Sequence, residues 1–190
     1  MKRTAALLLL ALASSLATAQ LDPKNLPDFP SEQWFSLART STGYLAGGNL
    51  AGTLWAFHVR GDELKKLGEG DPPTFAINGV LLQVKAVSRT VLETGRGGIL
   101  QAHKKYEQGH QAQTSKGVAF GDHDLCRNAA VPHQQWIARA PSGLTQAFVT
   151  FEVGDYVLMV VSAYEDEKRR QAVVRAVDDL CRSFKREKAS

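Results

Sequence analysis

Beyond its first 20 residues, this chain of 190 residues lacks any long apolar run. A membrane-spanning helix needs roughly 20 consecutive apolar residues, so we expect no transmembrane segment in the rest of the chain.

The chain also lacks a large excess of positive or negative charge. Without Lys2 and Arg3, the chain carries 21 basic and 19 acidic residues. That balance is too even for a polyanion-binding protein, so nucleic acid is not a predicted partner.

Catalytic motifs are missing as well. The sequence contains no G-x-S-x-G nucleophile elbow and no H-E-x-x-H zinc motif. Ser142 lies in Pro141-Ser142-Gly143, a turn between predicted strands, and lacks the strand–turn–helix setting that exposes a nucleophile. These absences favour a binding domain over an enzyme, and the residues predict no cofactor.

The first residues are typical of a cleaved secretory signal. Lys2 and Arg3 precede an apolar stretch over residues 7–12, and Ala17-Thr18-Ala19 offers the small residues that a signal peptidase recognises. We therefore predict a signal peptide over 1–19 and a secreted or periplasmic mature protein. No cysteine stands at the cleavage site, so a lipid anchor is not expected.

The mature chain is predicted to form one domain after an extended lead-in. Residues 20–33 contain three prolines, which lack the backbone donor and favour an extended segment. Residues 34–187 then have the length and apolar content of a single domain. We expect this domain to be a monomer.

The two cysteines, Cys126 and Cys181, suggest a disulfide bond. Export would place them in an oxidising compartment, where a pair of cysteines tends to form a bridge. A metal site is the alternative, but it would need further ligands and a tighter spacing.

Several strands can be predicted from alternation and turn residues. Asn78-Gly79 separates two stretches, 74–77 and 80–87, rich in branched or aromatic residues, and both turn residues tolerate the positive φ of a type I′ hairpin. Further strands are predicted over 53–59, 133–140, 144–153 and 156–162, the last two joined at Gly154-Asp155.

Two helices complete the predicted fold. Thr90-x-x-Glu93 has capping-box spacing and predicts a helix to about Tyr106, followed by a polar loop over 108–116. Ser162-x-x-Glu165 predicts the start of a closing helix whose apolar residues recur at helical intervals: Val173, Val177, Leu180 and Phe184. Adjacent strands with few helices imply an α+β class, an antiparallel sheet flanked by two helices in an α/β/α sandwich-like arrangement.

The segment from Val80 to the end resembles the PsbP-like group of small exported α/β/α sandwich proteins. The resemblance is carried by the strand 80–87 that leads into the helix after Thr90, by the hairpin of 148–151 with 156–161, and by the closing helix ending in Ser183-Phe184-Lys185. It implies a binding or assembly factor for larger complexes, as an analogy of fold.

Two sets of residues are candidate sites. Asp122-His123-Asp124, next to Cys126, combines an imidazole with two carboxylates and could hold Zn²⁺ or another divalent ion. The alternative is a solvated turn in which the aspartates cap local amides. The candidate binding residues for a protein or small ligand are aromatic side chains and one histidine: Trp34, Phe35, Trp55, His58 and Trp136.

The sequence thus predicts an exported, non-enzymatic binding or assembly domain of the cell envelope, whose partner is an envelope protein or a small ligand. The alternative is an envelope hydrolase or metal-binding protein centred on Asp122, His123 and Asp124. A structural or stress-related scaffold is a third possibility.

Overall fold

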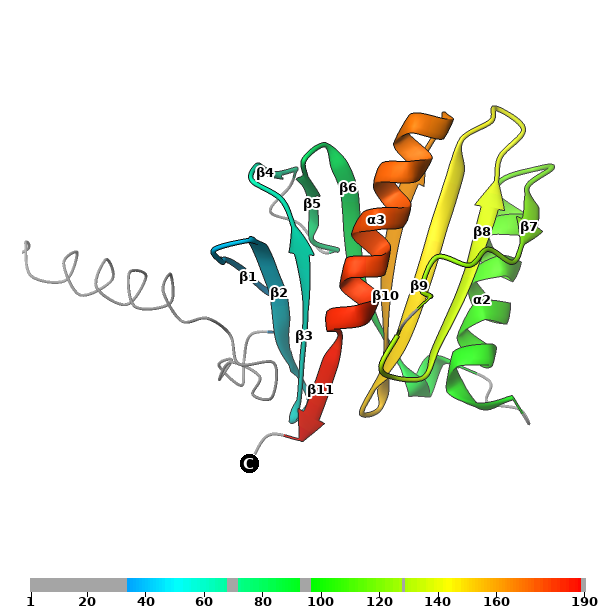
Figure 1. The fold of residues 1–190 in the computed structure, drawn as a ribbon. Helices are drawn as coiled ribbons and strands as arrows, with labels where there is room; N and C mark the ends of the chain where they lie inside the picture. The colour runs from blue at the N-terminus through cyan, green and yellow to red at the C-terminus, as the bar shows by residue number, and fades with distance from the viewer. Residues whose placement is uncertain (1–33, 68–71, 93–96, 128, 189–190) are drawn as a thin grey trace, which may run out of the picture.

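A computed structural model describes residues 34–67, 72–92, 97–127 and 129–188 (Figure 1). The predicted signal peptide and proline-rich lead-in lie outside these residues. The described part has the predicted α+β class, with two long helices and mainly β-structure. Within it, no helix has the length and apolar character needed to cross a bilayer.

The strands form two antiparallel sheets, which corrects the prediction of one sheet. The seven-stranded sheet has the order β4-β5-β6-β10-β9-β8-β7, with bounds Leu64–Lys66, Thr74–Ile77, Val80–Ser88, Tyr156–Tyr164, Thr145–Val153, His133–Arg139 and Ala119–Gly121. The four-stranded sheet has the order β1-β2-β3-β11, with bounds Ser36–Arg39, Gly43–Leu50, Thr53–Arg60 and Lys185–Lys188.

The Asn78-Gly79 hairpin is confirmed. Asn78 has φ 48° and Gly79 has φ 76°, and Ile77 of β5 pairs with Val80 of β6. Two consecutive residues with positive φ match the right-handed twist of the strands, which is why this dipeptide fixes the register here.

Strand β10 lies at the centre of the seven-stranded sheet, between β9 and β6, as its apolar sequence predicts. Successive side chains of a strand point to opposite faces. Val157 therefore packs in one cluster with Ile99, whereas Leu158 packs with Val173 and Val177 in another. A strand that is apolar on both faces can thus support a layer on each side.

Helix α3, Glu167–Ser183, packs on the second of these faces and reaches both sheets. The four residues predicted to anchor it are buried, with 0–3 % exposure: Val173, Val177, Leu180 and Phe184. Its start differs from the prediction, because Ser162 belongs to β10 and the side chain of Asp166 accepts the capping hydrogen bond from the Arg169 amide. Beyond the helix, the chain continues directly into β11 (Figure 1).

Helix α2, Gly98–Thr114, covers the opposite face of the seven-stranded sheet. It begins later and ends later than predicted. Thr90 lies in a short 3₁₀ turn, η1 (Arg89–Val91), capped by Ser88, while Glu93 lies outside the described residues. The predicted loop over 108–116 is mostly helical, because its glutamines and alanine are good helix formers.

Three strands were not predicted from their sequences, and all three lie at sheet edges: β1, β4 and β11. β4 is the short stretch Leu-Lys-Lys, and β11 is the charged stretch Lys-Arg-Glu-Lys. β11 has no apolar alternation and exists as a strand because it pairs with β3, with Arg186 opposite Trp55. β1 and β2 are short or glycine-rich, so neither has a clear period.

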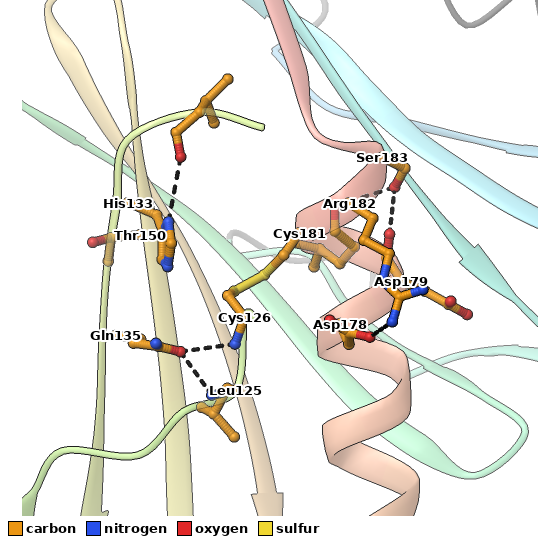
Figure 2. Close-up of a disulfide and its surroundings, with 12 residues drawn as sticks. Leu125, Cys126, His133, Gln135, Thr150, Asp178, Asp179, Cys181, Arg182 and Ser183 are labelled. Carbon is orange, nitrogen blue, oxygen red and sulfur yellow. Dashed lines mark hydrogen bonds and ion pairs between the residues drawn. A yellow bond between two sulfur atoms is a disulfide. The ribbon is translucent and has the colours of Figure 1, made fainter. Parts of the chain in front are cut away.

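The predicted bond between Cys126 and Cys181 is present, with the two Cα atoms 5.6 Å apart (Figure 2). Both cysteines are buried. The bridge ties the loop that follows β7 to the last turns of α3, so it holds a long surface connection against the core.

Truncating Leu180 tests the importance of α3. We expect Leu180→Ala to lower the free energy of unfolding by about 2–5 kcal/mol, because it opens a cavity in a fully buried position. The measurement is urea unfolding followed by circular dichroism. Arg175→Ala, on the exposed side of the same helix, should change stability by less than about 0.5 kcal/mol. Equal effects of the two variants would contradict this packing.

Removing the disulfide tests its contribution. The sequence separation of 55 residues gives an upper figure of about 4 kcal/mol in the chain-entropy model. We expect the double variant Cys126→Ala/Cys181→Ala to lose roughly 2–4 kcal/mol of unfolding free energy. A thiol assay on unreduced, denatured protein should find no free thiol, and two reactive thiols would disprove the bond.

Candidate functional site

An open cleft of about 510 Å³ lies at one side of the seven-stranded sheet. Its lining comes from three elements: Lys104 of α2, the loop 122–124 after β7, and the first residues of β8. All seven lining side chains are polar or charged: Lys104, Asp122, His123, Asp124, His133, Gln134 and Gln135. The cleft therefore contains the whole predicted Asp122-His123-Asp124 cluster.

Asp122 is paired with a lysine. Lys104 Nζ donates to Asp122 Oδ1 across 2.8 Å. This hydrogen bond and the positive charge of Lys104 hold the pKa of Asp122 below its ordinary value. Asp122 remains largely exposed, so the pair contributes little to stability. Its effect is to bring α2 and the loop together across the cleft.

His123 is held by an arginine from α3. Arg170 Nη1 lies 3.3 Å from His123 Nε2 and can only donate, which assigns the ring proton of His123 to Nδ1. That Nδ1 atom is buried and has no hydrogen-bond partner among the described residues. Arg170 is itself fixed by two hydrogen bonds of 2.7 Å to the carboxylate of Glu167.

The three loop side chains do not converge on one point. Asp124 Oδ2 lies 3.5 Å from Arg127 Nε, so each member of the cluster faces a different cationic side chain. Within the described part of the chain, no group of three or more His, Cys, Asp or Glu side chains is placed to hold a metal ion. A divalent ion would have to displace these cations.

Gln135 connects the cleft to the disulfide (Figure 2). Its side-chain oxygen accepts hydrogen bonds from the amides of Leu125, at 2.8 Å, and Cys126, at 2.9 Å. The neighbouring His133 Nδ1 lies 3.3 Å from the Val131 carbonyl. A carbonyl only accepts, so Nδ1 carries the proton and Nε2 can accept from a ligand.

Sequence reasoning missed four of the lining residues: Lys104, His133, Gln134 and Gln135. Lys104 belongs to a part of α2 whose inner and outer faces are both polar, so the sequence does not single it out. The polar run His133-Gln134-Gln135, which precedes the apolar Trp-Ile-Ala of the same strand, was a usable signal.

The aromatic candidates lie elsewhere. Trp55 and Trp136 are both 0 % exposed, so both are core residues that no surface ligand can reach in this structure. Trp34 and Phe35 are half-buried against the core, and the Phe35 ring lies 6.3 Å from Trp55 and 5.9 Å from Phe75, ring centre to ring centre. They help to join the two sheets.

His58 of β3 lies outside the cleft lining. Its Nε2 is 2.9 Å from Thr40 Oγ1, next to the turn between β1 and β2. Burial lowers the pKa of His58, and the negative charge of Asp179 partly opposes that shift. A half-buried histidine bonded to a neighbouring hydroxyl is sufficiently explained by packing.

The inward face of α2 is unusually polar. His103 and Glu107 are buried against the sheet, and His103 Nε2 lies 3.7 Å from Glu107 Oε1, which is 3.6 Å from Lys85 Nζ. Neither ring nitrogen of His103 has a hydrogen-bond partner in the described residues, and the same holds for Trp136 Nε1. Burial, together with the positive charge of Lys85, lowers the pKa of His103 to about 4.

No family model and no curated protein matches this chain.

The low pKa of His103 predicts a pH dependence of stability. Its value falls from 6.5 to about 4 on folding, so between these values the unfolded chain binds a proton that the folded protein excludes. Stability should fall as pH drops through this range, by up to about 3 kcal/mol from this group. We expect His103→Leu to flatten the urea-unfolding profile between about pH 7 and pH 4. If the unfolding free energies of the variant and the wild type changed with pH in parallel, His103 would not be a buried neutral imidazole.

Proposed function

We propose that this protein is an exported, non-enzymatic binding domain of the cell envelope and that the polar cleft is its binding site. The signal-like first residues support export, and the buried disulfide is compatible with an oxidising compartment. The partner is a protein segment or small ligand that forms hydrogen bonds with the cleft. The PsbP-like resemblance is consistent with such a role, and the main support for it is the cleft.

The observation that carries the proposal is the character of the cleft lining. The cleft is large enough for a ligand, is lined only by polar side chains, and draws them from α2, a loop and β8. Its side chains offer both donors and acceptors, among them Lys104, His133 Nε2 and the side-chain nitrogen of Gln135. The lining contains no Ser, Thr or Cys, so His123 and His133 have no side-chain nucleophile beside them in the cleft for covalent catalysis.

Site-specific photocrosslinking tests this proposal. Asp124 stands exposed in the cleft lining, and Asp155 stands exposed at the β9–β10 turn and is not part of that lining. With p-benzoylphenylalanine at either position in turn, we expect a discrete adduct in the producing cells from position 124 and none from position 155. The same adduct at both positions, or none at 124, would count against the cleft.

Two neighbouring lysines provide a matched control. Lys104 lines the cleft, whereas Lys105 points away from it on the same helix. Lys104→Gln should reduce the position-124 adduct, and Lys105→Gln should leave it unchanged.

Metal analysis of the purified protein distinguishes a binding domain from a metalloprotein. A stoichiometric ion that is lost in His123→Ala would favour a metalloprotein over the proposal.

A further inference from the structure

Strand β8 is longer than the edge strand that covers it. β7 pairs only with the end of β8, from Gly121 opposite Ile137 to Ala119 opposite Arg139. On its other side β8 is paired with β9 along its whole length. Residues 133–136 therefore have no strand beside them on the outer side, within the part of the chain that the structure describes.

The cleft lies along this uncovered edge. His133, Gln134 and Gln135 are consecutive in the strand, and all three line the cleft. Side chains of consecutive strand residues point to opposite faces of a sheet, so only a cleft at the strand's edge can contact all three. Gln134 contacts Gln101 of α2 at 3.2 Å, while Gln135 binds the loop amides of Leu125 and Cys126.

We propose that this edge binds an extended peptide segment of a partner protein, which adds a strand to the seven-stranded sheet in line with β7. Helix α2 forms one wall of the cleft and the disulfide-held loop forms the other, with the outward backbone groups of residues 133–136 between them. The inference rests on the proposed binding function and specifies its partner. Strand addition supplies affinity through main-chain hydrogen bonds.

Residues 133–136 of this edge carry none of the side chains that usually protect one. Natural sheets blunt an open edge with lysine, proline, a bulge or a covering segment. Residues 133–136 are His-Gln-Gln-Trp and contain neither lysine nor proline, whereas Pro132 lies immediately before them. Because proline has no backbone donor, it limits the available edge to these four residues, or about 13 Å of extended chain.

The charges around the cleft indicate the chemistry of the segment. Lys104 faces Asp122, Arg127 faces Asp124, and Arg170 faces Glu167 and His123. These pairs leave no uncompensated charge to attract a strongly acidic or basic peptide. The segment that fits is extended and polar, without net charge, and has no proline at the positions whose amides pair with β8.

Backbone methylation tests strand addition directly. The purified mature chain would be used to select binders from a displayed library of random peptides, and each selected peptide would then be resynthesised with single N-methyl groups. Every second amide of an added strand points towards its neighbour. We expect methylation to weaken binding by about tenfold or more at alternate positions, each of which loses a hydrogen bond, and to have little effect between them.

Amide hydrogen exchange locates the bound peptide. Bound peptide should slow exchange at amides within residues 133–136, and no change is expected at β1, the edge strand of the other sheet. Failure to select any peptide, or protection elsewhere than β8, would overturn the proposal. Peptides that bind at the cleft without an alternating methylation pattern would overturn strand addition alone and leave the proposed binding function standing.

Discussion

Helix α3 is the contact on which the two sheets depend. Leu180 and Phe184 are almost fully buried, and the Phe184 ring stacks on Phe151 of the seven-stranded sheet with their centres 3.9 Å apart. The same helix packs against β3 and continues into β11, the last strand of the four-stranded sheet. Burying each such apolar side chain stabilises the folded state by roughly 1.5–3 kcal/mol. The contacts of α3 with the two sheets are therefore a main source of the protein's stability.

The two helices contribute differently to stability. α3 presents apolar side chains to the core, whereas α2 presents His103 and Glu107 to a sheet face that contains Trp136 and Phe148. Buried polar atoms without partners cost free energy. The packing of α3 on one face of the seven-stranded sheet is thus more stabilising than the packing of α2 on the other face. The cleft lies beside α2.

Local signals in the sequence were enough to predict about half of the fold. Asn78-Gly79 fixed a hairpin, and the apolar stretch of β10 and the helical spacing of Val173 to Leu180 identified a central strand and its helix. β11 could not be predicted, because it becomes a strand through pairing with the distant β3. β1 could not be predicted either, because its four residues show no clear period and pair only with the neighbouring β2. The start of α2 was misplaced because Thr90 and Glu93 matched a capping pattern that the structure does not use for this helix.

The candidate site was predicted only in part. The Asp122-His123-Asp124 loop does line the cleft, but its partners Lys104 and Arg170 lie on two different helices. No spacing rule connects residues so far apart in the chain. The tryptophans illustrate the opposite problem: residue type alone does not distinguish an aromatic that contacts a partner from one that fills the core, and Trp55 and Trp136 fill the core.

The pairing of β3 with β11 has a consequence for biogenesis. Its partners are separated by about 130 residues, since Ala56 lies opposite Lys185. Contacts between such distant segments form slowly and late, and the four-stranded sheet cannot be completed until Lys185–Lys188 has left the ribosome. For most of its synthesis the chain therefore has β3 without its second partner strand, and one edge of the smaller sheet forms only after the larger sheet's strands have been made.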